Sequence, residues 1–351
     1  MRTKTKNQPK SDLIAIALAA YRPKPRFFSQ QLQSLVDQSH QNWICVITFD
    51  SLMREALANP SIKKFKRDKR FIWRQNPRQL GVVRNFERAM ALSLAYKPTA
   101  IAFCDQDDVW LPNKLQVSLA VLNQKPPMSL VHCDSIVASS KRTYNFSNWE
   151  DLNPIPTLSS VRHLLLRNTV SGAGTLFDAR LGSMAKRSPD LKSVYHDRWI
   201  AFAAAIHGGV HPIEEKLYIY RQHAGNVLGS ARLRKERRRT ESSIKNIKQP
   251  LRVRALRRAQ YGVGMFNDRQ LIASQVRMQL AGSHLYSSRV LLAVMFLWCA
   301  IENLWKGNAG AANAIVALRL FTYGILSVFS RSRIQTALGI SRRRSAPRRR
   351  L

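Results

Sequence analysis

Short apolar runs alternate with amphipathic helical patterns over the first 230 residues, and this alternation constrains the fold most. Runs typical of buried strands lie at 13–20, 43–49, 70–74 and 99–104. Helical periodicity with one apolar face occurs between them, at about 26–39 and from Gly81 to about 96. Strands and helices that alternate at this spacing predict an α/β fold, with a Rossmann-like, mostly parallel sheet flanked by helices.

The first apolar run follows a basic start, which is also the pattern of a secretory leader. The run is at the short end for a leader, and Asp12 interrupts its approach. We therefore favour a first buried strand, preceded by a basic tail at 1–11. The four cysteines are scattered and form no CxxC pair, which indicates reduced thiols and a cytosolic protein.

Positive charge is distributed unevenly along the chain. The formal net charge is +36, and residues 231–351 hold 25 basic but only 4 acidic residues. We therefore expect one α/β domain over 12–230, a basic, partly amphipathic helical extension over 231–335, and an Arg-rich tail over 336–351. Such an excess predicts anionic partners, which include nucleic acid, acidic lipids and phosphorylated substrates.

Two apolar stretches in the extension, 290–301 and 309–329, lack the roughly 20 uninterrupted apolar residues of a membrane-spanning helix. Flanked by arginines, they suit helices that lie on an anionic membrane surface, or helices that pack on the α/β domain. Both interpretations stay open. A nucleic-acid-binding protein is a further alternative, although the sequence has no zinc-ligand spacing or RNA-recognition motif, so nucleic acid is the less expected partner.

Three carboxylates, Asp105, Asp107 and Asp108, directly follow the fourth strand-like run. Ligands of open α/β sheets bind at the carboxyl ends of strands. Asp105 and Asp107 are two residues apart and could both reach one cation, as in phosphate-handling enzymes that use Mg²⁺ or Mn²⁺. The alternative is that Asp107 or Asp108 caps a helix that begins near Pro112.

Five motifs occur in a characteristic order: LGVVRNFERAM at 80–90, FCDQDDVWLPNKL at 103–115, HCD at 132–134, HDRW at 196–199 and YRQHAGN at 220–226. Over residues 12–229 the chain resembles the family-2 glycosyltransferases with a GT-A fold, and especially their bacterial rhamnosyltransferase-like branch. The resemblance implies inverting transfer of a sugar from a UDP- or dTDP-linked donor. It also implies a lipid-linked or cell-surface polysaccharide acceptor and a peripheral location at the cytoplasmic face of the cell membrane.

The resemblance also implies roles for individual residues. Asp105 and Asp107 match the DxD motif, which binds the donor and a Mn²⁺ or Mg²⁺ ion, with Asp107 as metal ligand. Asp197 matches the general base that deprotonates the acceptor hydroxyl, although the local sequence alone favours a helix cap. His223 matches a second metal ligand, and Arg221 a residue near the diphosphate.

Implied contacts to the donor nucleotide are Tyr21, Arg22, Asp50 and Arg84, and implied acceptor contacts are Ser171, Gly172 and Trp199. One departure stands out: the family usually has two adjacent Asp residues after the second strand, and here Phe49 precedes Asp50. Phe49 could stack on a base or belong to the core. This departure keeps a catalytically degenerate GT-A protein open as an alternative.

Overall fold

The structure, a computed structural model, describes residues 12–139, 142–152, 160–166, 168–191, 194–223, 269–276, 294–297, 318 and 321–322. The chain divides into two compact units. The first comprises Met1–Ile244 with Met278–Gly282, and the second comprises Lys245–Arg277 with Ser283–Leu351. The basic tail predicted at 1–11 and the Arg-rich tail at 336–351 lie outside the described residues.

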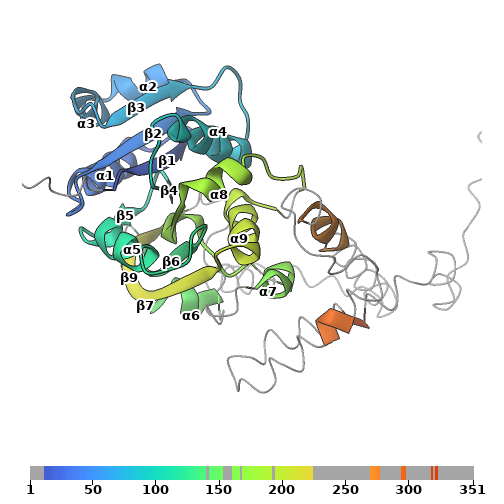
Figure 1. Cartoon of the computed structure of the whole chain (residues 1–351). Helices are drawn as coiled ribbons and strands as arrows, with labels where there is room; N and C mark the ends of the chain where they lie inside the picture. Colours follow the sequence, from blue (N-terminus) through green and yellow to red (C-terminus); the bar gives the residue numbers. More distant parts are fainter. Residues whose placement is uncertain are drawn as a thin grey trace, which may run out of the picture. The chain divides into compact units, whose positions relative to one another are not determined.

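The first half of the sheet is parallel, as the apolar runs predict. It is built from β1 (Ile14–Ala20), β2 (Trp43–Phe49), β3 (Phe71–Gln75) and β4 (Ala100–Cys104) in the order β3-β2-β1-β4. Its connections contain α1 (Pro25–Val36), α2 (Met53–Ala58), α3 (Pro60–Lys63), the 3₁₀ turn η1 (Lys64–Arg67) and α4 (Val82–Leu94). Figure 1 shows α1 and α4 packed beside these strands. Every residue of β4 is buried, which explains its uninterrupted apolar sequence.

The second half of the sheet mixes strand directions. Its strands are β5 (Val109–Trp110), β6 (Leu130–Ser139), β7 (Thr143–Ser147), β8 (Thr175–Asp178) and β9 (Val210–Gln222). The nine strands of the described part follow the order β3-β2-β1-β4-β8-β6-β9-β5, with β7 paired to β6. Because β8 runs antiparallel to both β4 and β6, the parallel pattern stops at β4 and resumes only between β6 and β9. The predicted α/β class is confirmed.

The remaining helical segments of the first unit are α5 (Lys114–Leu122), α6 (Asn148–Leu152), α7 (Val161–Leu166), the 3₁₀ turn η2 (Gly172–Gly174), α8 (Ala179–Met184) and α9 (His196–Ile206). Figure 1 shows α8 and α9 close to α4. Helix α9 is almost wholly apolar after its first turn, because residues 198–204 are all buried.

Phe49 belongs to the core. Its side chain is fully buried, stacks on Trp73 with ring centroids 5.9 Å apart, and meets Phe28 edge to face at 6.1 Å. Aromatic pairs in such geometries add about 0.5–1.5 kcal/mol to the free energy of burial. Of the two roles considered for Phe49, the structure therefore shows core packing.

In the second unit, the structure describes helical residues at 269–276, 294–297, 318 and 321–322. Most of the apolar stretches 290–301 and 309–329 lies outside the described residues. Within the described part of the chain, no helix has both the length and the apolar character needed to cross a bilayer.

Candidate active site

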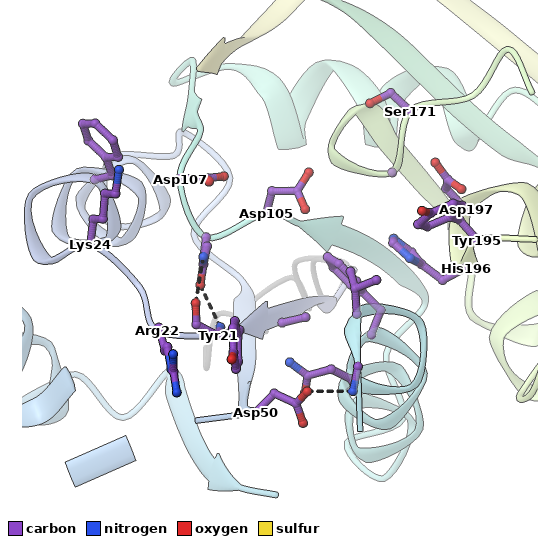
Figure 2. Close-up of a pocket in the computed structure, with 18 of the residues that line it drawn as sticks. Tyr21, Arg22, Lys24, Asp50, Asp105, Asp107, Ser171, Tyr195, His196 and Asp197 are labelled. Atoms are coloured by element: carbon purple, nitrogen blue, oxygen red, sulfur yellow. Dashed lines mark hydrogen bonds between the residues drawn. The ribbon is translucent and has the colours of Figure 1, made fainter. Parts of the chain in front are cut away.

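A cavity of about 590 Å³ opens at the carboxyl ends of β1, β2 and β4. The residues that directly follow these strands, Tyr21, Asp50 and Asp105, all line it. Its other predicted members are Arg22, Asp107, Ser171, Gly172, Asp197 and His223. Figure 2 shows Asp105 and Asp107 on one side of the cavity, and Tyr195, His196 and Asp197 on the other. The fold therefore brings together residues far apart in sequence.

The acidic loop after β4 is held to the loop after β1. The Gln106 side chain accepts a hydrogen bond from the Tyr21 backbone N–H at 2.8 Å and donates one to the Tyr21 carbonyl at 3.2 Å. Gln106 thus turns toward Tyr21. Asp107 and His223 meet directly, with Oδ2 of Asp107 2.7 Å from Nε2 of His223. The His223 ring stacks on Phe27 at 5.4 Å between centroids.

Asp108 is fully buried behind this pair. Its Oδ1 accepts a hydrogen bond from the Arg221 backbone N–H at 3.0 Å, which ties the end of β9 to the acidic loop. Asp108 does not cap α5, because Asn113 occupies the N-cap position of that helix. Burial raises the pKa of Asp108 well above its usual range, and the neighbouring Asp105 and Asp107 carboxylates raise it further.

Negative charge accumulates at the acidic loop. Burial raises the pKa of Asp105 to about 7, and the Asp107 and Asp197 carboxylates contribute to the rise. A cation at this position would relieve the repulsion. Among the described residues, no group of three or more His, Cys, Asp or Glu is placed to hold a metal ion. The Asp107–His223 pair nevertheless fits a divalent ion that takes its remaining ligands from water and substrate phosphates.

Asp197 lies in the first turn of α9, whose N-cap position is held by Tyr195. Its carboxylate accepts hydrogen bonds from the backbone N–H groups of Arg198, at 2.6 Å, and Gly172, and from the Asn168 side chain. Burial outweighs these bonds and raises the pKa of Asp197 to about 6. A carboxylate with this pKa is ionised at neutral pH and remains basic enough to accept a proton.

His196 and Tyr195 line the cavity beside Asp197, and neither is among the site residues expected from the sequence. The His196 ring stacks on Phe86 at 3.8 Å, and burial lowers its pKa to about 3, so the ring is neutral. A Cβ atom at Gly172 would lie 2.9 Å from Nε2 of His196. A side chain at this position would therefore displace the His196 ring where the 171–174 segment meets α9. The signal in the sequence was the HDRW motif, which contains His196.

Asp50 organises the loop between β3 and α4. Its carboxylate accepts hydrogen bonds from the backbone N–H groups of Leu80 at 2.6 Å and Gly81 at 2.7 Å, and from the Asn76 side chain at 3.0 Å. Gly81 has a φ of +83°, which favours glycine. Arg22, after β1, has a φ of +42° and donates its backbone N–H to Ser51 Oγ at 2.9 Å.

Replacement of Asp50 with Ala is expected to destabilise the protein by about 2–4 kcal/mol, because three donors lose a shared buried acceptor. Thermal unfolding of the two proteins measures the difference. Asp37→Ala is the matched control, since the Asp37 side chain accepts one exposed hydrogen bond, from Gln33. Equal melting temperatures for Asp50→Ala and the unmodified protein would show that the loop does not depend on Asp50.

Three predicted site residues do not line the cavity. Arg84 points away from it and donates to Glu87 at 2.6 Å and to the Ser188 carbonyl at 2.9 Å. Trp199 is 2% exposed and packs in the core. Arg221 is buried behind the cavity, with its guanidinium 4.5 Å from the centre of the Phe27 ring.

The chain is similar to known glycosyltransferases in sequence and in fold. The model of "Glycosyl transferase family 2" matches residues 21–180. An uncharacterized glycosyltransferase of Methanocaldococcus jannaschii is 26% identical over 120 residues, which are 34% of this chain and 40% of that protein. The chain thus matches less than half of that relative's length.

Two solved structures are similar to this chain, and the first of them shares its fold. Staphylococcus aureus TarS, solved with UDP-GlcNAc, is 13% identical, with a TM-score of 0.53 over 90% of this chain and 81% of that one. A mannosyltransferase of Pyrobaculum calidifontis, solved with GDP-Man and Mn²⁺, is 12% identical, with a TM-score of 0.48 over 91% of this chain and 88% of that one. Residues 21–180 are therefore similar to the glycosyltransferases of family 2, and the chain shares the GT-A type of α/β fold with TarS.

Proposed function

We propose that this chain is an inverting, metal-dependent glycosyltransferase that uses a nucleoside-diphosphate sugar, with UDP- and dTDP-sugars as the first candidates. One observation carries the proposal. The cavity holds an acidic loop, suited to a metal–diphosphate group, opposite a single carboxylate whose pKa is about 6. Inverting transfer needs a leaving group on one side of the sugar and a base on the other.

The donor nucleotide is assigned to the end of the cavity formed by Tyr21, Arg22 and Asp50. Tyr21 is 40% exposed and offers a ring on which a base can stack. Two of the Asp50 hydrogen bonds are to backbone N–H groups, so its main contribution is to shape the loop that closes this end. The identity of the base then depends on the loops around Tyr21 and on Gln79 and Asn85, which also line the cavity.

Asp107 and His223 are the proposed ligands of a Mn²⁺ or Mg²⁺ ion, and Asp105 contributes charge beside them. When bound, such an ion neutralises the charge that develops on the departing nucleoside diphosphate. Two contacts position His223: Asp108 holds the backbone of Arg221, and Phe27 supports the His223 ring. Arg221 therefore acts by placing His223, two residues further along the chain.

Asp197 is the proposed general base. Its carboxylate is held by the backbone N–H groups of Arg198 and Gly172, so it keeps a fixed orientation toward the cavity. The proton of the acceptor hydroxyl passes to Asp197 as the oxygen attacks the anomeric carbon. Ser171 and Gly172 form the adjoining wall and are assigned to the acceptor. A lipid-linked or polysaccharide acceptor, and peripheral attachment to an anionic membrane, belong to the same proposal.

The rate of donor turnover at saturating donor and metal is expected to fall about tenfold per pH unit below roughly pH 6. The sign follows from the base role: Asp197 must be ionised, and its pKa is raised to about 6, so protonation removes activity as the pH drops through that value. A pH profile of kcat between pH 4.5 and 8 measures this. A profile that stays flat down to about pH 5 would contradict the assignment of Asp197.

A thermal-shift panel tests the donor class directly. UDP, dTDP, GDP, CDP and ADP are each added with and without Mn²⁺. A ligand that binds only the folded state raises the apparent stability by RT ln(1 + [L]/Kd), which is about 2.7 kcal/mol at 100 times Kd. A shift for one or two nucleotides that needs the metal supports the proposal, and equal small shifts for all five reject it.

A further inference from the structure

A second hollow, about 460 Å³ in volume, lies on the opposite face of α4 from the cavity. It is lined by Arg78, Gln79, Leu80, Arg84, Glu87, Arg88, Ala91, Lys186 and Arg187, and we call it the basic groove. The cavity uses Val82, Asn85 and Phe86 of α4, whereas the groove uses residues 84, 87, 88 and 91. With 3.6 residues per turn, these two sets occupy opposite sides of the helix. Gln79 lines both spaces, so the groove and the cavity share a rim.

Positive charge dominates the basic groove. Five cationic side chains line it, against the single carboxylate of Glu87. That carboxylate is already engaged: it accepts from Arg84 at 2.6 Å and from the backbone N–H and hydroxyl of Ser188 at 2.7 and 2.6 Å. Glu87 therefore balances Arg84, and the charges of the other four cations are not offset by a carboxylate that lines the groove.

Arg88 gives a second, independent indication of a ligand. Its Nε atom is buried and has no hydrogen-bond partner among the described residues. A buried donor without a partner is unfavourable, and Arg88 is one of the residues that line the groove. The arginines of the groove come from three segments: the loop before α4, α4 itself and the segment after α8.

Phosphate is the ligand that fits best. Guanidinium groups bind phosphate oxygens through paired, charge-assisted hydrogen bonds, and several arginines around one hollow can share a dianion. A flat lipid surface would contact protruding side chains, whereas the Arg88 Nε atom is recessed. The metal ion and the donor diphosphate are already assigned to the cavity, on the other face of α4. We propose that the basic groove binds a phosphate group of the acceptor outside the cavity, at the rim that the two spaces share. This inference rests on the proposed function.

The measurement must report on individual arginines, because the whole chain is strongly basic and attracts anions at many positions. The full chain is treated with phenylglyoxal, with and without tripolyphosphate, and modification of each arginine is followed by mass spectrometry. Since protection grows with occupancy, Arg78, Arg88 and Arg187 are expected to react about fivefold more slowly with saturating tripolyphosphate. Arg54 and Arg67, exposed on the same unit but outside the groove, should react at an unchanged rate.

Variants separate a specific site from general attraction. Arg88→Gln/Arg187→Gln should abolish the protection of Arg78, and the control Arg54→Gln/Arg67→Gln, which removes the same charge, should leave it intact. If the Arg88 variant does not fold, Arg78→Gln/Arg187→Gln is used, with Arg88 as the reporter. Uniform protection of all exposed arginines, or equal loss in both double variants, would overturn the proposal.

Two further outcomes are decisive. Hydrolysis of the donor needs no acceptor, so the Arg88→Gln/Arg187→Gln protein should hydrolyse the donor at a rate within about twofold of the unmodified protein. Loss of donor hydrolysis would assign the groove to the donor and overturn the inference. Stronger protection by an RNA oligonucleotide than by tripolyphosphate at equal phosphate concentration would assign the groove to nucleic acid instead. If the nucleotide thermal shift fails while the groove arginines are still protected, the proposed function is wrong and the phosphate site stands.

Discussion

Asp197→Asn is expected to lower the rate of sugar transfer by about 10²- to 10⁴-fold, the usual contribution of a general base. The amide has the size of the carboxylate and can still accept the hydrogen bond from the Arg198 backbone, so the N-terminal turn of α9 should keep its shape. The amide cannot, however, take up the proton of the acceptor hydroxyl. The measurement is kcat for donor turnover, with donor affinity followed by calorimetry.

Donor affinity should stay within about threefold of the unmodified protein, since the base contributes to the transition state and little to the ground state. Asp190→Asn is the matched control, because Asp190 is exposed and does not line the cavity. An Asp197→Asn protein with full activity would remove Asp197 from the mechanism. A protein that loses activity and donor binding together would place Asp197 in the donor site.

Asp107→Asn is expected to remove metal-stimulated turnover, with a loss of roughly 10³-fold that reflects several kcal/mol of charge stabilisation. The change removes one of two proposed protein ligands and also replaces the carboxylate that contacts His223. Turnover is measured over a Mn²⁺ titration. The unmodified protein should show saturable activation, and the variant should show a flat response.

Glu215→Gln serves as the control, because Glu215 is an exposed carboxylate on β9, away from the cavity. His223→Ala should cost less than Asp107→Asn, since water can replace a neutral ligand more easily than a charged one. Full Mn²⁺ activation of Asp107→Asn would show that the metal, if used, binds elsewhere. Equal activity of the unmodified protein with and without a chelator would reject the metal altogether.

The local parts of the fold could be predicted from the sequence. The predicted run at 43–49 coincides with β2, and the helix expected after Gly81 is α4, because buried strands and amphipathic helices carry their own periodicity. The second half of the sheet could not be predicted in this way. The direction of β8 depends on its pairing with β4 and β6, which no local pattern records.

The same distinction applies to the site. Asp105 and Asp107 could be placed because they end a strand, and the ends of parallel strands meet at one edge. Arg84 and Trp199 were expected near the ligands, yet Arg84 is paired with Glu87 and Trp199 packs in the core. A motif gives the position of a residue along the helix but not the face that its side chain occupies. The resemblance to the family alone could not reveal the basic groove, which forms only when the 186–187 segment meets α4.

We expect the acidic loop after β4 to bind a metal ion together with a nucleoside diphosphate. Calorimetric titration of the full chain with the nucleotide selected by the thermal-shift panel, in the presence and absence of Mn²⁺, tests it most directly. Binding should be at least about tenfold tighter with Mn²⁺, and Asp107→Asn should lose this difference. Metal-independent binding of equal strength in both proteins would contradict it.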